Sequence, residues 1–124
     1  DIRTRKICGY EALARWRDPE LGLIPPTEFI KVAEESGLIY SLGEWVLSTA
    51  CAQAKAWHDA GLPKVRMAVN VSATQFRRHD FIEMVEGILE DSGLDPESIC
   101  SFMKVRKWTP GQARGDEKRG IPPT

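Results

Sequence analysis

The 124-residue sequence lacks any long apolar run, because no stretch approaches the ~20 apolar residues that a bilayer-spanning helix needs. It also lacks the apolar h-region of a secretory signal, since its first ten residues, DIRTRKICGY, are largely charged or polar. Cysteine is scarce: the three cysteines are widely spaced and form neither a CxxC motif nor a Cys/His pair of zinc-ligand spacing. We therefore expect a soluble domain with free thiols in a reducing cytoplasm and no membrane span.

An excess of charge of one sign is absent as well. The 17 Lys and Arg residues balance 18 Asp and Glu residues, which argues against a nucleic-acid polymer as partner. The two ends differ, however: residues 1–100 carry 11 basic and 16 acidic residues, whereas residues 101–124 carry six and two. The final segment has no hydrophobic periodicity and is interrupted by Gly and Pro. We expect a patterned body over residues 1–99 and a disordered tail over 100–124.

The body alternates strand-like and helix-like segments. Strands are predicted at Ile7–Trp16 and Val65–Val71, with a further strand starting in Ile99–Val105. Helices are predicted at about residues 27–37, with Thr27 as N-cap, and at 41–60 and 80–92, and a turn at Asp18–Gly22. Trp45 and Trp57 recur at helical spacing and are expected in the core. This order is typical of βα units around a parallel sheet.

Three residues of the first predicted strand alternate along it. Glu11, Leu13 and Arg15 would share one face, with the carboxylate and the guanidinium about 13 Å apart. A carboxylate can hold a hard cation, and the planar fork of arginine suits phosphate. The alternative, which spacing alone favours, is a solvated charged face.

Asn70 interrupts the apolar run of the second predicted strand, close to its carboxyl end. Its burial would cost several kcal/mol without a hydrogen-bonding partner, and strand carboxyl ends are where α/β folds place their sites. Asn70 therefore either belongs to a site or bonds a neighbouring loop. Gln75, in the loop that follows, could reach the same face.

Four segments of the body, taken together and in this order, resemble successive signatures of the EAL domain, a family of bacterial cyclic-di-GMP phosphodiesterases. These segments are GYEALARW (9–16), IPPTEFI (24–30), AEESGLI (33–39) and NVSATQF (70–76). The resemblance is collinear over residues 1–99. It implies a TIM-like (β/α) barrel that hydrolyses cyclic-di-GMP to pGpG with Mg2+ or Mn2+. By resemblance, Glu11 and Asn70 are metal ligands, and Leu13 and Arg15 contact the dinucleotide.

The sequence departs from the family pattern at both ends. The family's opening strand would precede Asp1, and its next metal-ligating glutamate should follow Ile99, where the chain instead reads ICSFMK. The family's later Asp-Asp pair, lysine, final acidic ligand and glutamine also have no counterparts. Since a full barrel needs roughly 250 residues, we expect a partial barrel of the first few strand/helix units, inactive alone. A reading-frame change or a truncated gene would explain the change of composition near residue 100.

Three other interpretations stay open. The chain could be a catalytically dead module that binds cyclic-di-GMP or a protein. It could self-associate through uncovered strand edges, or work with sensory or GGDEF (diguanylate cyclase) domains outside this sequence. An unrelated α/β domain with chance motifs is the last alternative.

Overall fold

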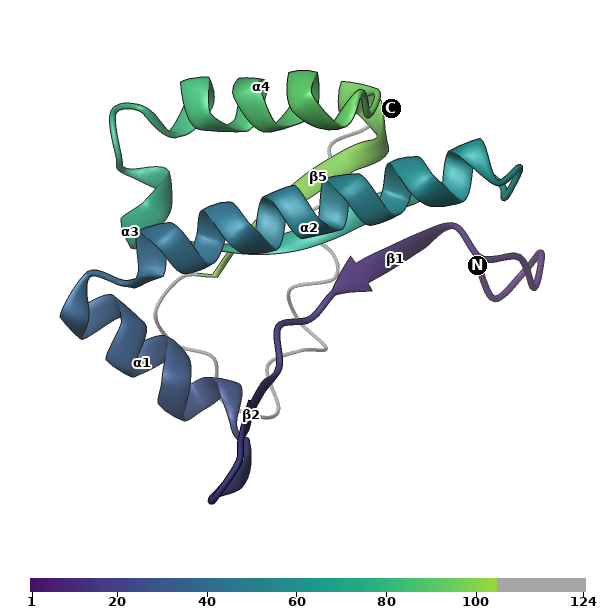
Figure 1. Ribbon diagram of the computed structural model, residues 1–124. Helices are drawn as coiled ribbons and strands as arrows, with labels where there is room; N and C mark the ends of the chain where they lie inside the picture. Colours follow the sequence, from purple (N-terminus) through teal and green to yellow (C-terminus); the bar gives the residue numbers. More distant parts are fainter. Residues whose placement is uncertain (105–124) are drawn as a thin grey trace.

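The computed structural model describes residues 1–104 of the chain (Figure 1). Its elements run in the order β1 (Gly9–Ala12), β2 (Trp16–Asp18), β3 (Gly22–Ile24), α1 (Pro26–Ser36), α2 (Ile39–Asp59), β4 (Arg66–Ser72), α3 (Ala73–Phe76), α4 (Phe81–Ser92), the 3-10 helix η1 (Pro96–Ser98) and β5 (Ile99–Lys104). The tail was predicted over residues 100–124; residues 100–104 of it lie in β5, and residues 105–124 lie outside the described residues.

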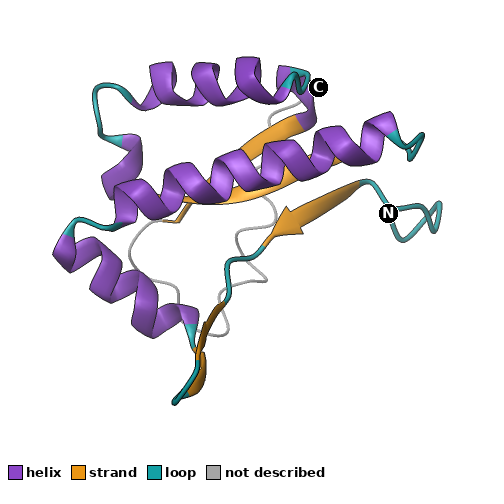
Figure 2. Ribbon diagram, viewed as in Figure 1, coloured by secondary structure: helices purple, strands orange, loops and turns teal. Residues whose placement is uncertain are grey.

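Three parallel strands form the main sheet, in the order β1-β4-β5. β1 pairs with β4 from Gly9 opposite Arg66 to Ala12 opposite Val69, and β4 pairs with β5 along its length. Helices α2 and α4 lie over one side of this sheet (Figure 2). The βα units expected from the sequence are thus confirmed, and within residues 1–104 the sheet does not close into a barrel.

The core lies between this sheet and its two covering helices. In β4, Met67, Val69 and Val71 are buried, while Ala68 and Asn70 between them are only half-buried. This alternation follows from the period of two of a strand, with one face turned to the helices. The other buried members of the cluster come mainly from the two helices: Leu47, Ala50, Cys51, Ala54, Phe81, Ile88 and Leu94. Burial of this apolar surface is the main force that holds the sheet to α2 and α4.

The single strand predicted over Ile7–Trp16 is wrong, because two short strands occupy that segment. β1 ends at Ala12, and Trp16 begins β2, which pairs antiparallel with β3 across the predicted turn. Asp18 closes this turn: its Oδ1 accepts the backbone N–H groups of Glu20 and Leu21, each at 2.9 Å. The chain therefore leaves the sheet after Ala12 and forms a hairpin beyond the carboxyl end of β1 (Figure 1).

Two local predictions about the helices also fail. Thr27 is not the N-cap of α1, which begins at Pro26 after Pro25 without a side-chain cap; the backbone N–H of Glu28 bonds the Pro25 carbonyl instead. Trp45 is 59% exposed rather than buried, because it lies on α2 beside the free edge of β1. Trp57 is half-buried and packs against Tyr10 with ring centroids 4.9 Å apart.

Within residues 1–104, no helix has the length and apolarity to cross a bilayer.

Candidate functional site

Glu11 and Asn70 meet on the face of the sheet that α2 and α4 do not cover. Glu11 of β1 lies opposite Ala68 of β4, so Asn70, two residues further along β4, shares its face. The Asn70 side chain donates its Nδ2–H to Glu11 Oε1 at 2.8 Å. The hydrogen-bonding partner of Asn70 is therefore a carboxylate from another strand and not a neighbouring loop.

Leu13 and Arg15 do not share a strand with Glu11. The prediction that the three residues alternate along one strand, with the carboxylate and the guanidinium about 13 Å apart, is therefore wrong. Both residues lie in the connection between β1 and β2. Leu13 is 51% exposed, and the exposed Arg15 donates from Nη1 to the Ala14 carbonyl at 2.9 Å. The guanidinium has no carboxylate partner among the described residues, so its charge is free to meet an anion.

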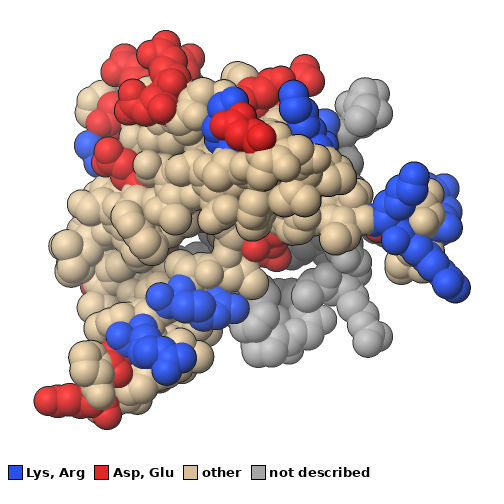
Figure 3. Space-filling view, turned by 45° about the vertical axis from the view of Figure 1, so that its right-hand side comes forward, with Lys and Arg blue, Asp and Glu red and all other residues tan. Residues whose placement is uncertain are grey.

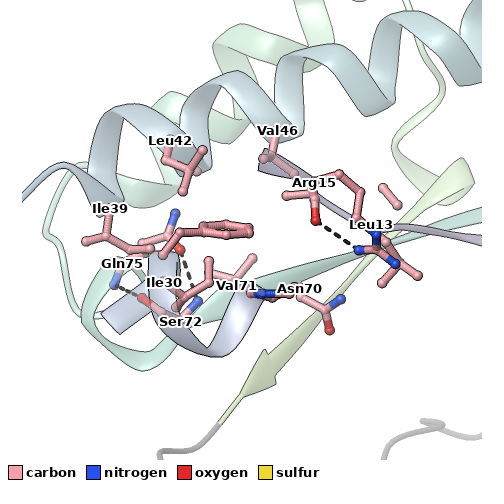
Figure 4. A pocket seen from close by; sticks show the side chains of 15 residues that line it. Leu13, Arg15, Ile30, Ile39, Leu42, Val46, Asn70, Val71, Ser72 and Gln75 are labelled. Carbon is pink, nitrogen blue, oxygen red and sulfur yellow. Dashed lines mark hydrogen bonds between the residues drawn. The ribbon is translucent and has the colours of Figure 1, made fainter. Parts of the chain in front are cut away.

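Two open cavities border this connection, and Leu13 and Arg15 line both. The first, of about 140 Å³, lies between α1, α2 and the end of β4, and Asn70 contributes to it. The second, of about 360 Å³, lies between β1 and α2 and is lined by Glu11. Figure 4 shows Leu13, Arg15 and Asn70 on one side of the first cavity, with Ser72 and Gln75 on the other.

Gln75 does not reach the face of Glu11 and Asn70, contrary to expectation. It is only 4% exposed and forms a capping box with Ser72 at the start of α3. The Ser72 backbone N–H donates to Gln75 Oε1 at 3.0 Å, and the Gln75 N–H donates to Ser72 Oγ at 3.2 Å. The S-x-x-Q spacing of residues 72–75 is the sequence signal that predicts this box.

The charge around the site is unevenly distributed over the surface. Acidic side chains gather over α4, along the top of Figure 3, whereas Lys and Arg gather in the N-terminal loop. The band over α2 between them is mostly uncharged. Arg15, four residues after Glu11, is the cation nearest to it in sequence, and it lines both cavities.

The side chains of this site are oxygen ligands of the type that a hard cation prefers, but they are too few for a two-metal centre. Glu11 supplies a carboxylate and Asn70 an amide oxygen, which are ligands that Mg2+ accepts alongside water. The geometry recorded here turns the amide nitrogen of Asn70 toward Glu11, so a half-turn of the amide would be needed to present Oδ1. Within residues 1–104, no cluster of three or more His, Cys, Asp or Glu side chains is placed to hold a metal ion. A two-metal centre is therefore not provided by these residues.

Comparison with known proteins identifies the family of this chain. The family model described as EAL domain matches residues 1–113. The chain is 50% identical over 99 residues to protein y4lL of Sinorhizobium fredii, covering 80% of this chain and 12% of that protein. It is 43% identical over 93 residues to the bifunctional diguanylate cyclase/cyclic di-GMP phosphodiesterase MucR of Pseudomonas aeruginosa, covering 75% of this chain and 14% of MucR.

Solved structures give the same result for the fold. The phosphodiesterase PaMucR, in complex with c-di-GMP, superposes with a TM-score of 0.75 at 41% identity, over 77% of this chain and 39% of that one. The EAL enzyme Bd1971, in its cGMP-bound form, superposes with a TM-score of 0.75 at 28% identity, over 83% of this chain and 30% of that one. The chain thus spans well under half the length of these relatives, and its fold is part of their TIM-like barrel. On the family-model match, the sequence identities and the shared fold, this chain belongs to the EAL domain family.

Proposed function

We propose that this chain forms the nucleotide-facing portion of a cyclic-di-GMP phosphodiesterase domain. The observation that carries the proposal is the hydrogen bond between Glu11 and Asn70, two oxygen-bearing side chains that are 59 positions apart in the sequence. This pair lies beside the two cavities that Leu13 and Arg15 line. The similarity to MucR, whose solved phosphodiesterase is a complex with c-di-GMP, supports the same ligand.

Arg15 is suited to hold a phosphate of the dinucleotide. Its guanidinium is exposed and is bonded only to the carbonyl of the residue before it. Exchanging one neutral carbonyl for an anionic phosphate oxygen gives a stronger, charge-assisted hydrogen bond. The exposed side chain of Leu13, two residues earlier, offers an apolar surface to the flat face of a base.

Glu11 and Asn70 would hold Mg2+ or Mn2+ on the same side of the sheet. A cation held by these two residues would supply Lewis-acid chemistry, namely activation of water and stabilisation of the leaving oxygen. The part of the protein is to fix the Glu11 carboxylate beside the Asn70 amide and so orient both toward the phosphodiester. The β1–β4 pairing, which aligns the two strands in register, supplies this orientation.

We further propose that this chain alone does not turn over cyclic-di-GMP. Strand β5, the next in the sheet, reads ICSFMK and contributes no carboxylate. The only acidic residues after Ile99 are Asp116 and Glu117, in a basic segment. Hydrolysis with two metal ions needs more carboxylates than Glu11 and these two isolated acids supply.

A second candidate function, a module that binds the nucleotide without hydrolysis, is favoured by one specific observation. Leu13 and Arg15 line both cavities, and neither is a proposed metal ligand. Nucleotide binding through these two residues therefore does not require all the catalytic residues of the family.

Self-association is a further proposal, because β1 and β5 are edge strands of the described sheet and Trp45 is exposed beside β1. Sedimentation velocity tests it: a concentration-dependent dimer supports it, and a monomer throughout contradicts it.

Binding and turnover are measured separately. Calorimetry with cyclic-di-GMP and Mg2+ should show saturable binding that Arg15→Ala weakens by about tenfold or more, since a charge-assisted hydrogen bond contributes about 1.5–3 kcal/mol. Arg17→Ala, which removes the same charge two residues later, is the matched control and should bind as the parent does. Chromatography of the products should show no pGpG above the Glu11→Ala control with Mn2+. Absence of binding would overturn the proposed ligand, and turnover above that control would overturn the proposed inactivity.

A further inference from the structure

Gly43 lies inside α2, where glycine is an unfavourable choice. A glycine in a helix interior costs about 1 kcal/mol relative to alanine, so its presence there has a packing reason. The structure provides that reason: a Cβ atom on Gly43 would lie 1.4 Å from Gln75 Nε2. The missing side chain leaves a notch in α2, and the Gln75 amide occupies it.

From this notch, the Gln75 side chain caps the end of β4. Its Oε1 accepts the backbone N–H of Ser72, the last residue of β4, and its own N–H bonds the Ser72 hydroxyl. Both residues are buried, at 4% and 9% exposure. Because water cannot easily replace these bonds, loss of either partner leaves a buried polar group unpaired.

This end of β4 needs such support because only one strand flanks it. The pairing with β1 ends where Ala12 lies opposite Val69, whereas the pairing with β5 continues to Ser72. Asn70 falls in this one-sided stretch, two residues before Ser72 along the strand. What holds Ser72 therefore also limits how Asn70 can turn toward Glu11.

We propose that Gln75, held in the Gly43 notch, is a positioning residue that sets the Asn70 side chain against Glu11. Its amide oxygen is bonded to Ser72 and its amide nitrogen lies at Gly43, so it acts on Asn70 through the end of β4. Its part in ligand affinity rests on the proposed function, but its effect on Asn70 does not. Groups that orient ligating side chains in this way typically change affinity by about 10- to 100-fold.

Asn70 is the only asparagine of the chain, which gives a direct readout. In protein labelled with 15N-asparagine, a single side-chain NH2 pair reports whether Asn70 bonds Glu11. Gln75→Met removes the capping oxygen but still fills the notch with a side chain of similar length. We expect it to shift the Asn70 signal in the direction seen in Glu11→Ala and to weaken cyclic-di-GMP binding by about tenfold. Glu86→Met, at an exposed position of α4 that lines neither cavity, is the control and should change neither.

A pair of notch variants separates positioning from simple packing. Gly43→Ala alone should lower the melting temperature, because the new methyl group collides with Gln75. Gly43→Ala/Gln75→Ala should regain most of that loss, since the methyl group occupies the vacated notch. The Asn70 signal should nevertheless stay displaced, because Ser72 still lacks its cap.

The outcomes are distinguishable. If Gln75→Met leaves the Asn70 signal at its parent position, or if the double variant restores signal and stability together, Gln75 is only a packing residue and the inference is overturned. If the parent chain does not bind cyclic-di-GMP, the proposed function fails, and the Asn70 signal still decides the inference by itself.

Discussion

The Asn70 amide donates to the Glu11 carboxylate at 2.8 Å, across 59 positions of the sequence. The two residues lie on adjacent parallel strands, β4 and β1, on the face that the helices leave uncovered. A neutral amide beside a carboxylate satisfies both groups without a cation. The same two groups supply oxygen ligands if a cation enters.

Asn70→Asp converts this hydrogen bond into a contact between two carboxylates. The two like charges would repel each other at this distance. We expect stability at pH 7 to fall by about 1 kcal/mol, since one hydrogen bond is lost and a repulsion is gained. Millimolar Mg2+ should raise the melting temperature of this variant more than that of the parent, because the cation binds the folded pair.

Glu11→Gln/Asn70→Asp is the control for this prediction. It restores one carboxylate and one amide in exchanged positions, so the destabilisation should largely disappear. Equal melting temperatures for parent and Asn70→Asp, with or without Mg2+, would show that the two side chains do not meet.

The buried face of β4 should dominate stability. Val69 is 1% exposed in the core cluster, so Val69→Ala removes two methyl groups from a packed site and should cost about 2 kcal/mol. Val32→Ala makes the same change at a position of α1 that is 57% exposed, and should alter stability by less than about 0.5 kcal/mol. Urea denaturation measures both, and similar losses would contradict the placement of the core.

The hairpin of β2 and β3 should loosen in acid. The backbone N–H groups of Leu21 and Glu20 hold the pKa of the Asp18 carboxyl below its usual range. A group whose pKa is lowered by folding contributes stability above its ordinary pKa and loses it as the pH falls through the lowered value. The amide resonances of Glu20 and Leu21 should therefore shift together only at pH values below the usual aspartate range. A midpoint at or above that range would contradict these bonds.

The thiols should differ in reactivity. Burial raises the pKa of the Cys51 thiol, which is 1% exposed, whereas Cys8 is exposed. Since the thiolate is the reactive species, a disulfide reagent at pH 8 should modify Cys8 rapidly and Cys51 only as fast as the fold opens. The comparison uses Cys51→Ser/Cys100→Ser and Cys8→Ser/Cys100→Ser, each of which keeps one thiol. Equal rates would show that Cys51 is not in the core.

Much of the fold is predictable from the sequence because local patterns agree with tertiary packing. The β-branched run at residues 65–71 and the terminator at Gly61 gave β4 and the end of α2 closely. The segment Ile7–Trp16 failed because its second half pairs with residues beyond the turn, which no local periodicity reveals. The prediction that Trp45 lies in the core is wrong because helical spacing does not say which part of the apolar face of a helix is covered by a neighbouring strand.

The site was only partly predictable. Strand alternation groups Glu11, Leu13 and Arg15 but does not link them to Asn70, and only the resemblance to a family joins all four residues. No spacing rule links Asn70 to a carboxylate 59 positions away; the parallel pairing of β1 and β4 does so. Gln75 was assigned to the wrong face because its loop position was considered without the capping box that turns its side chain into α2.

The most direct test is a titration of cyclic-di-GMP, with Mg2+, into protein labelled with 15N-asparagine. We expect a saturable shift of the Asn70 side-chain signal in the parent chain, and a much weaker response at the same nucleotide concentrations in Arg15→Ala. A signal that does not move in the parent, or that moves equally in Arg15→Ala, would contradict the assignment of this face to the nucleotide.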